Sequence, residues 1–431
     1  MTRKMKDSGI EWIGEIPEEW EVVKLKYLGE FSSSGIDKKI NENEKLIKIV
    51  NYTDVYNNWQ FRLYNMDYMI VSANSDQIKQ HLLKRGDLIF TPSSETIEDI
   101  GISAVVMEDL INTAFSYHVL RYKFNSSEKV IFEYRRYLCN NNYSYNYFSF
   151  LAKGTTRKTL KRSDFNEAKV VLPPLKTQEK ISVFLDNKMA DTENIKSAII
   201  KEIETLENYK KSMITEAVTK GLDKNVEMKD SGIEWIGEIP KHWSVKQLKY
   251  VMNNLNYQRV PVDASKRNNT SEKLYDYYGA TGVIDKIDGY TTVGSNILIG
   301  EDGANLIFRN LPLIYIAEGK YWVNNHAHIL HPKDGNLDFF AYQMEIIDYR
   351  NYITGAAQPK LNLENLKKVK LVCPTQKDQN EIANYLNKKT KLINDSIAIK
   401  QKQLETLEEY KKSLIYEYVT GKKEVKDGEE S

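Results

Sequence analysis

The residues best suited to chemistry by type and spacing are three histidines, His326, His328 and His331. Imidazole nitrogens bind transition metals, and an H-x-H-x-x-H pattern brings three of them near one another. No cysteine or carboxylate lies beside them in the sequence, so ordinary strand and loop histidines are the simpler interpretation. Glu301 and Asp302 carry oxygen ligands but are also typical of an acidic turn. We therefore predict no metal site.

Signatures of catalysis are missing from the sequence. It contains no G-x-G-x-x-G, G-x-x-x-x-G-K-[ST], H-E-x-x-H or G-x-S-x-G pattern. Residues 154–159, GTTRKT, are similar in composition to a phosphate-binding loop but lack its second glycine. We expect a chain that binds no cofactor and has no catalytic residues of its own.

Positive charge is local rather than global. The net charge is +1, but residues 151–170 hold six Lys or Arg against two acidic residues, and residues 241–270 hold six against one. Such clusters suit contacts with nucleic acid. Many of the 28 tyrosines sit beside Asn and Ser, as in residues 140–148. This pattern fits either an adaptable recognition surface or tyrosines at the rim of a half-buried sheet.

The elements that position these residues are duplicated. The segment MKDSGIEWIGEIP at Met5–Pro17 returns unchanged at Met228–Pro240, 223 positions later. A second repeat joins Ile203–Gly221 to Leu404–Gly421 at an offset of 201, so the intervening part is 22 residues shorter in the second half. Each half therefore has a shared start, a shared end and a different middle, which indicates two whole domains in tandem. We interpret the repeated opening segment as a structural clasp.

The middles read as mixed β-structure with short helices. Alternating or β-branched runs predict strands at 45–50, 87–92, 102–107 and 118–124 in the first half. The second half shows similar runs, and a helix is predicted over Leu337–Ile353.

Each half ends in a long amphipathic helix. Apolar residues recur at alternating steps of three and four from Ile181 and from Ile382 onward, which is typical of a coiled-coil seam. Thr177 and Thr375 are the predicted N-caps. A helix with one apolar stripe needs a partner, and the duplicate supplies it. We predict an antiparallel pair, which places the two globular domains at opposite ends.

This arrangement resembles the specificity subunit of type I restriction–modification systems. The resemblance covers nearly the whole chain and rests on residues 8–20 (SGIEWIGEIPEEW), 154–181 (GTTRKTLKRSDFNEAKVVLPPLKTQEKI) and 206–221 (LENYKKSMITEAVTKG). The second middle, with YYGATGVIDKIDGY, LIGEDGAN, WVNNHAHIL and GAAQPKLN, is similar to one subtype of recognition domain. One departure is that the family's Glu-Gln after the prolines stands here as Gln178-Glu179 and Gln376-Lys377.

The resemblance implies an α+β fold with two pseudo-symmetric α/β target-recognition domains, separated by two long helices that form an antiparallel coiled coil. The expected boundaries are a first recognition domain at 1–175, a first spacer helix at 176–222, a second recognition domain at 223–374, a second spacer helix at 375–420 and a disordered tail at 421–431.

The resemblance also implies the activity. Each recognition domain is expected to read one half of a split double-stranded DNA target, with the helices setting the gap between the halves. Two modification subunits carrying the methyltransferase chemistry are expected to dock on the helices and opening segments, and restriction subunits with translocase and nuclease activity to join them. S-adenosylmethionine, ATP and Mg are then expected on those partners.

Base edges are read by Arg, Lys, Asn, Gln, Ser and Thr side chains, which the polar loops of both middles supply. For each residue alone, a solvated loop is the competing interpretation. In the first domain the candidate DNA contacts are Ser33, Ser34, Lys38, Lys39, Ser93, Ser94, Thr96, Thr155, Thr156, Arg157 and Lys158. In the second domain they are Gln258, Arg259, Tyr278, Thr281, Asn324, Asn325, Gln358 and Lys360.

Two other functions compete with this one. A coiled-coil adaptor with two protein-binding domains would have no DNA affinity, and near-neutral charge favours it slightly. A self-sufficient methyltransferase or nuclease would need a motif such as N/D-P-P-Y, which the sequence lacks. With two cysteines, no apolar N-terminal region and no long apolar run, the sequence suits the cytoplasm, without membrane contact.

Overall fold

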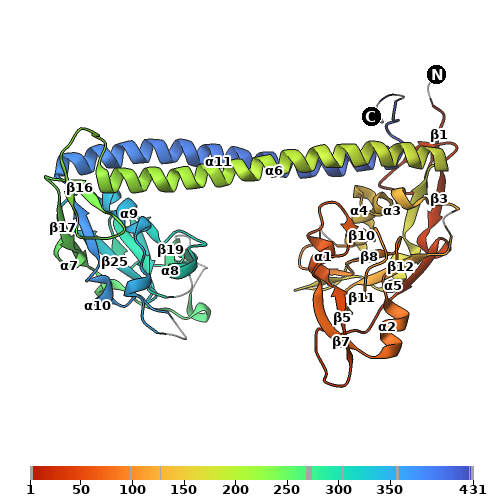
Figure 1. Cartoon of the computed structure of the whole chain (residues 1–431), viewed down its shortest axis with the longest axis horizontal. Helices are drawn as coiled ribbons and strands as arrows, with labels where there is room; N and C mark the ends of the chain where they lie inside the picture. The colour runs from red at the N-terminus through yellow and green to blue at the C-terminus, as the bar shows by residue number, and fades with distance from the viewer. Residues whose placement is uncertain are drawn as a thin grey trace. The chain divides into compact units, whose positions relative to one another are not determined.

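A computed structural model of the chain contains two long helices. They are α6 (Leu175–Lys220, 46 residues) and α11 (Gln376–Val419, 44 residues). The structure describes residues 3–97, 100–126, 128–267, 274–302, 305–355, 359–426 and 428. Contacts divide the chain into two units, Met1–Ile199 with Gln401–Ser431 and Ile200–Lys400. Each unit contains one globular domain together with parts of both helices (Figure 1).

The two helices pack antiparallel within each unit. In the first unit the ring of Phe184 on α6 lies 4.4 Å from that of Tyr418 on α11. In the second unit Lys210 Nζ on α6 donates to Asn394 Oδ1 on α11 at 3.0 Å. Residue numbers fall along α11 as they rise along α6, which confirms the antiparallel prediction.

The helices begin differently. The Thr375 hydroxyl accepts a hydrogen bond from the backbone N–H of Asp378 at 3.2 Å, which confirms Thr375 as an N-cap. The prediction that Thr177 caps the first helix is wrong, because that helix already begins at Leu175. Its first turn forms on the carbonyl of Pro174, which accepts from the Thr177 N–H at 2.8 Å. Proline suits this place because the start of a helix leaves its backbone N–H groups unpaired in any case.

The first domain contains a five-stranded sheet in the order β4-β12-β8-β10-β6 and a three-stranded sheet in the order β11-β5-β7. Its strands are β1 (Met5–Asp7), β2 (Glu15–Pro17), β3 (Glu21–Lys24), β4 (Gly29–Ser32), β5 (Lys45–Val50), β6 (Arg62–Leu63), β7 (Met69–Ala73), β8 (Leu88–Phe90), β9 (Ser93–Ser94), β10 (Ser103–Val106), β11 (Thr113–Phe115), β12 (Leu120–Phe124), β13 (Lys158–Thr159) and β14 (Lys169–Leu172). Its helices are η1 (Leu25–Tyr27), α1 (Tyr52–Tyr56), α2 (Ser75–His81), η2 (Phe132–Tyr134), α3 (Arg135–Leu138), α4 (Asn142–Leu151) and α5 (Arg162–Glu167).

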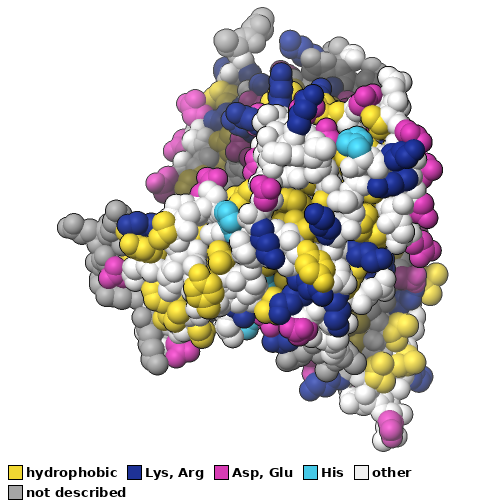
Figure 2. Space-filling view, turned by 90° about the vertical axis from the view of Figure 1, so that its left-hand side faces the viewer, with side chains coloured by type: hydrophobic (Ala, Val, Ile, Leu, Met, Phe, Trp, Pro, Cys, Tyr) yellow, Lys and Arg dark blue, Asp and Glu magenta, His cyan; other side chains and the backbone are white. Residues whose placement is uncertain are grey.

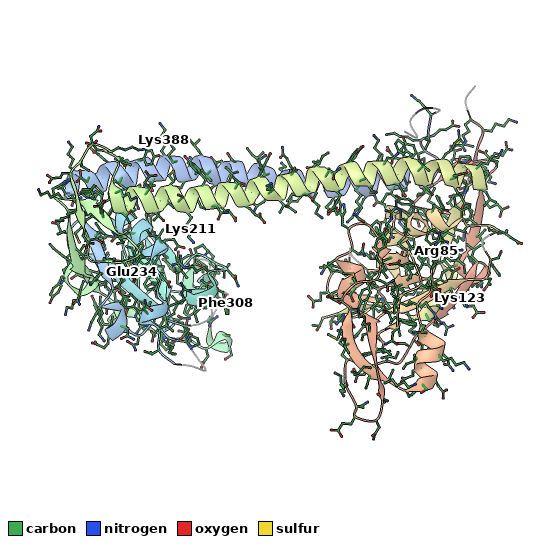
Figure 3. All side chains as sticks on the ribbon, viewed as in Figure 1. Arg85, Lys123, Lys211, Glu234, Phe308 and Lys388 are labelled. Carbon is green, nitrogen blue, oxygen red and sulfur yellow. The ribbon has the colours of Figure 1, made fainter. Side chains whose placement is uncertain are left out.

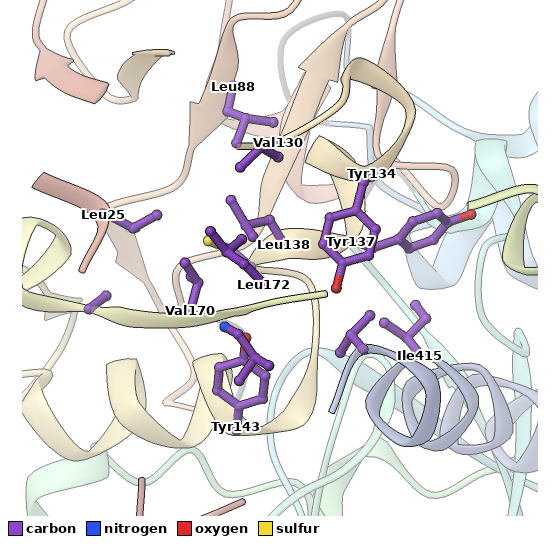
Figure 4. Packing of buried hydrophobic residues seen from close by; sticks show 14 of the residues in the cluster. Leu25, Leu88, Val130, Tyr134, Tyr137, Leu138, Tyr143, Val170, Leu172 and Ile415 are labelled. Atoms are coloured by element: carbon purple, nitrogen blue, oxygen red, sulfur yellow. The ribbon is translucent and has the colours of Figure 1, made fainter. Parts of the chain in front are cut away.

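The four strands predicted for this domain are present as β5, β8, β10 and β12. Every residue of β8 and β10 is buried, as expected for short apolar runs at the centre of a sheet. The core continues onto the helices, since Ile415 of α11 packs in the same cluster as Tyr134 and Tyr137 (Figure 4). The first domain and its helix segments therefore share one hydrophobic core.

The second domain has two four-stranded sheets, β18-β25-β22-β23 and β20-β19-β24-β21. Its strands are β15 (Met228–Asp230), β16 (Glu238–Pro240), β17 (Ser244–Gln247), β18 (Met252–Asn254), β19 (Leu274–Gly279), β20 (Gly282–Asp288), β21 (Thr292–Val293), β22 (Asn296–Gly300), β23 (Ile314–Ala317), β24 (Lys320–Val323), β25 (Ala327–Pro332) and β26 (Lys370–Cys373). Its helices are α7 (Leu248–Val251), η3 (Asn256–Gln258), η4 (Ala264–Lys266), α8 (Asn305–Phe308), α9 (Leu337–Ile346), η5 (Arg350–Tyr352) and α10 (Leu363–Leu366). Helix α9 ends seven residues before the predicted Ile353, because Ile347 is extended and its carbonyl accepts a hydrogen bond from Arg309.

Both repeated opening segments fold as the same hairpin, β1 with β2 and β15 with β16. Each hairpin covers the C-terminal end of a long helix. In the first unit Gly421, just after α11, has φ +71°, and a Cβ there would lie 2.5 Å from Pro17. In the second unit a Cβ on Gly221 would lie 3.2 Å from the Trp243 ring. The identical segments therefore act as the expected clasp on the helix ends. Glycine after each helix lets the backbone approach Pro17 and Trp243 this closely.

Trp20 and Trp243 follow the two hairpins at equivalent positions but differ in their hydrogen bonds. Trp243 Nε1 donates to the Asp378 carboxylate at 2.9 Å, whereas Trp20 Nε1 is buried without a partner among the described residues. The residue that corresponds to Asp378 in the first half is Thr177. We expect Thr177→Asp to raise the free energy of unfolding by about 1.5–3 kcal/mol, as hydrogen bonds to charged acceptors do.

Thermal and urea denaturation of the purified chain measure this gain. Thr177→Asn offers an uncharged acceptor and serves as the control, with a smaller expected gain. Equal or lower stability of the Thr177→Asp variant would contradict the explanation.

The expected fold class is confirmed, since the chain is α+β with two domains and two long antiparallel helices. The predicted domain boundaries stay a prediction. The chain packs beyond residue 421, against the expectation of disorder from there on, because Lys422 Nζ donates to the Glu15 carbonyl and Val425 is buried in the first unit. None of the helices in the described part of the chain has the length and hydropathy that a membrane span requires.

Candidate nucleic-acid interface

Four candidate residues of the first domain meet at one short pair of strands that lie far apart in the sequence. Strand β9 pairs antiparallel with β13, with Lys158 opposite Ser94. Arg157, beside this pair, donates from Nε to Ser93 Oγ at 3.2 Å, and its guanidinium lies 5.5 Å from the ring centroid of Tyr52. These two contacts hold the Arg157 side chain in place. Arg157 is nevertheless exposed to solvent. Arginine held in this way can donate to phosphates or to guanine edges.

His118 adds to the same surface. Burial lowers the pKa of His118, the positive charges of Lys38 and Arg157 lower it further, and Asp37 opposes them. Lys38 and Arg157 therefore lie near one imidazole, although they are far apart in the sequence. The His118 ring also lies 3.8 Å from the ring of Tyr117. The first domain thus brings two of its candidate cations close to His118.

The remaining candidates of the first domain differ in exposure. Ser34 and Ser94 are buried, and their hydroxyls accept backbone N–H groups of Ile36 at 3.2 Å and Thr96 at 3.3 Å. These two serines shape their loops rather than face solvent. The exposed candidates are Ser33, Lys38, Lys39, Thr96, Thr155, Thr156 and Arg157.

The candidates of the second domain gather around two acidic residues. Arg259 Nη1 lies 2.8 Å from Glu301 Oε2, and Lys360 Nζ lies 3.0 Å from Asp302 Oδ1. Partial burial opposes ionisation of Asp302, but hydrogen bonds from His326 and Lys360 outweigh it and lower the pKa of that carboxyl. Arg259 and Lys360 are therefore paired within the domain before any ligand arrives.

Other candidates of the second domain form hydrogen bonds next to this cluster. The backbone N–H of buried Asn324 donates to the Tyr278 carbonyl at 3.0 Å, and its side chain accepts from the His326 N–H at 2.8 Å. The Tyr278 ring packs 5.5 Å from that of Tyr321. Thr281 and Asn325 are exposed, Gln258 is half-buried, and Gln358 lies outside the described residues.

The three histidines face different partners. His326 contacts Asp302, His328 Nε2 lies 2.7 Å from the Leu361 carbonyl, and His331 Nδ1 lies 3.1 Å from the Ser295 carbonyl. Among the residues that the structure describes, no group of three or more His, Cys, Asp or Glu side chains could hold a metal ion.

Further cations lie on another part of the second domain. Lys246, Tyr250 and Lys333 line a pocket of 240 Å³ beside β17. Figure 2 shows lysine and arginine side chains among apolar ones on the face that carries β17 and α7. Lys246 and Lys249, which belong to the positive cluster at 241–270, are exposed.

Several residues of these clusters are absent from the predicted set. Tyr52 and His118 organise the first cluster, and Glu301 and Asp302 organise the second. From the sequence, Glu301 and Asp302 were interpreted only as part of an acidic turn. Tyr52 gave no signal, because its contact with Arg157 joins segments that are 105 residues apart.

We expect the double variant Arg157→Ala/Lys158→Ala to weaken DNA binding by the assembled complex. Each lost phosphate contact should reduce the slope of log K against log salt by roughly 0.9. Binding titrations at several salt concentrations measure both effects. Lys84→Ala/Lys129→Ala removes two cations that pair with Asp109 and Glu21, and serves as the control. Unchanged affinity and slope in the first variant would rule out these contacts.

Comparisons with known proteins show the family of the chain. The family model described as "Type I restriction modification DNA specificity domain" matches residues 17–205 and 240–409. The chain is 27% identical over 430 residues to the "Putative type I restriction enzyme MjaX specificity subunit" of Methanocaldococcus jannaschii, with 96% of each chain covered. It is 26% identical over 302 residues to the MjaVIII specificity subunit of the same organism, covering 64% of this chain and 67% of that one.

A solved structure shares the fold. It comes from work titled as the structural basis of complex assembly and conformational transition of the type I R-M system. The TM-score is 0.67 at 14% identity, with 94% of this chain and 99% of that chain covered.

Proposed function

The chain belongs to the type I restriction modification DNA specificity family, and we propose that each of its two recognition domains reads one half of a split DNA target. As a specificity subunit it is not itself an enzyme. Its two matched regions fall on the two domains, which share their hairpins and helix ends but differ in their sheets. This combination of shared frame and different reading surfaces is the observation that carries the proposal.

The two reading surfaces differ in chemistry as well as in fold. The first presents exposed Arg157 beside Tyr52, and the second holds Arg259 and Lys360 on acidic partners. A paired guanidinium must exchange its carboxylate for a base edge or phosphate, or act through other donors nearby. Different donor sets select different bases, so the two half-sites should differ in sequence.

The long helices are proposed to set the gap between the half-sites. Helix α6 is unbroken over 46 residues, which corresponds to about 69 Å at 1.5 Å per residue. An antiparallel partner stiffens it along both units. A fixed gap follows if neither helix bends when DNA binds.

An exposed stripe on each helix is proposed to dock the modification subunits. Thr205, Tyr209, Ser212 and Glu216 on α6 recur on α11 as Thr406, Tyr410, Ser413 and Glu417. All of them are exposed except Glu417, which is half-buried and pairs with Lys423. Spacings of four, three and four place each set on one helix face. Identity at exposed positions is not needed for packing, and exposed positions earlier in the helices differ, as with Val183 and Asn384.

Each unit contains one such stripe and one hairpin of identical sequence. Two copies of one partner are therefore proposed to bind, each bringing methyltransferase chemistry and S-adenosylmethionine. Restriction subunits that use ATP and Mg are proposed to join them. Side chains project from both helices along their length, as Figure 3 shows for Lys211 on α6 and Lys388 on α11.

Mapping methylated adenines in cells that express this chain with its modification subunit tests the proposal. The expected result is one motif made of two different short sequences separated by a fixed number of unspecified bases. A contiguous motif, or no motif in cells with an active modification subunit, would overturn it. The same map gives the gap length directly.

A further inference from the structure

A loop of the first domain contacts both helices of its unit. Residues 57–61 connect α1 to β6, and the ring of Trp59 in this loop has an ammonium group close by on each helix. Lys196 Nζ of α6 lies 3.5 Å from the ring centroid and Lys411 Nζ of α11 lies 3.9 Å from it. Lys411 also donates to the Trp59 carbonyl and is 3% exposed. Trp59 is therefore held by cation–π contacts with two different helices.

The loop is built to hold this shape. Phe61 has φ 56°, a left-handed backbone conformation that needs support from its surroundings. Asn58 Oδ1 provides support by accepting the backbone N–H of Arg62 at 3.0 Å. Arg62 Nη2 in turn lies 2.7 Å from Asp186 on α6. The loop is therefore attached to the helices through Trp59, and the strand that follows it is attached through Arg62.

Burial of the Lys411 ammonium group costs solvation free energy, and contacts with the aromatic rings of the loop offset part of this cost. Burial lowers the pKa of Lys411 to about 7, with the Glu408 carboxylate opposing this effect and Lys196 adding to it. The faces of Trp59 and Phe61 favour the charged form, with Phe61 4.2 Å from Nζ. A buried lysine in this place is explained by the aromatic loop that covers it.

The same loop leads directly to the reading surface. Helix α1, which precedes the loop, begins at Tyr52. The Arg157 guanidinium lies over the Tyr52 ring. Tyr52 and Tyr56 stack within α1, with centroids 5.2 Å apart. A shift of Trp59 relative to the helices would therefore move α1 and the guanidinium that rests on it.

The second unit uses other contacts at the equivalent helix positions. Lys210, the counterpart of Lys411, donates to Asn394 on the other helix rather than to an aromatic ring. Asn387, the counterpart of Asp186, accepts the Tyr342 hydroxyl at 2.9 Å. The charged, aromatic clamp is thus a feature of the first unit in the described part of the chain.

We infer that Trp59, Lys196 and Lys411 are positioning residues that fix the first recognition domain on its helices and thereby restrict the gap length that the complex accepts between half-sites. This inference rests on the proposed reading of a split target. It assigns part of the gap selection to a loop of one domain, in addition to the length of the helices.

The test uses Lys411→Met, which keeps the side-chain volume and removes the charge, and Trp59→Leu, which keeps an apolar side chain and removes the aromatic ring. Lys210→Met is the matched control for Lys411→Met. DNA substrates carry the mapped half-sites at the natural gap and at gaps one base pair shorter or longer. We expect the preference of the reconstituted complex for the natural gap to fall about tenfold in both clamp variants and to stay unchanged in Lys210→Met. An unchanged preference in both clamp variants would overturn the inference.

A second measurement separates this inference from the proposed function. Spin labels introduced by Gln80→Cys on α2 and Ser197→Cys on α6, in a Cys373→Ser background, report the distance between domain and helix in the chain alone. We expect a narrow distribution of the distance between the two labels when Trp59, Lys196 and Lys411 are unchanged, and also in Lys210→Met. We expect a broader distribution in Lys411→Met and Trp59→Leu. Equal widths would overturn the clamp whatever the DNA result. If the complex methylates no split target while the clamp variants broaden, the proposed function fails and the clamp stands.

Discussion

Replacing Asp186 by alanine is expected to lower the free energy of unfolding of the first unit by about 3 kcal/mol. The Asp186 carboxylate accepts the Tyr137 hydroxyl at 2.6 Å, pairs with Arg62 at 2.7 Å and contacts Arg136. The Arg136 side chain is 4% exposed. Burial lowers the pKa of Arg136 to about 10, so the guanidinium stays charged near neutral pH and needs its counter-ion. Removing one partner of a buried pair costs about 3–5 kcal/mol, and the lower end applies because Asp186 is partly exposed.

Urea denaturation followed by tryptophan fluorescence measures the loss. Asp186→Asn keeps the shape and one acceptor, so it isolates the charge. Asn387→Ala in the second unit removes a neutral acceptor at the equivalent helix position and is expected to cost about 1 kcal/mol. If Asp186→Ala and Asn387→Ala cost the same, the ion pair does not carry the attachment of the first domain.

The long helices and their pairing were predictable because periodicity is a local property. Steps of three and four persist over forty residues, and the duplicated stripe supplies a partner helix, for which the antiparallel direction was the prediction. The helix starts show the limit of the same reasoning. Thr375 caps as predicted, but Thr177 does not, because Pro174 can start the first turn and the sequence does not show which residue does so.

The candidate DNA surface was predictable by residue type but not by pairing. Arg157 and Ser93 were both in the predicted set and meet in space, because Ser93 lies in β9 and Arg157 directly precedes its partner strand β13. Arg259 was predicted as a DNA contact, and Glu301 pairs with it from 42 residues away. Burial and ion pairing depend on tertiary packing, which a turn-like sequence leaves open.

Tyr209→Ala together with Tyr410→Ala is expected to abolish binding of the modification subunit at micromolar concentrations. Both tyrosines are about half exposed, at 56% and 50%. Exposed tyrosines of this kind are frequent binding hot spots, and removing one costs about 2 kcal/mol or more, roughly thirtyfold in Kd. Native mass spectrometry with the purified modification subunit measures the result as stoichiometry.

The single variants make this prediction specific. The tyrosines occupy equivalent places in identical stripes, so each single variant should lose one of two bound partners and keep the other. Leu392→Ala, which removes an exposed apolar side chain where the two helices differ, should keep both. Equal retention of two partners in all variants would exclude the stripes as docking surfaces. Loss of both partners from one single variant would instead mean that the two sites are coupled, and repetition of the sequence would then reflect one joint surface rather than two independent ones.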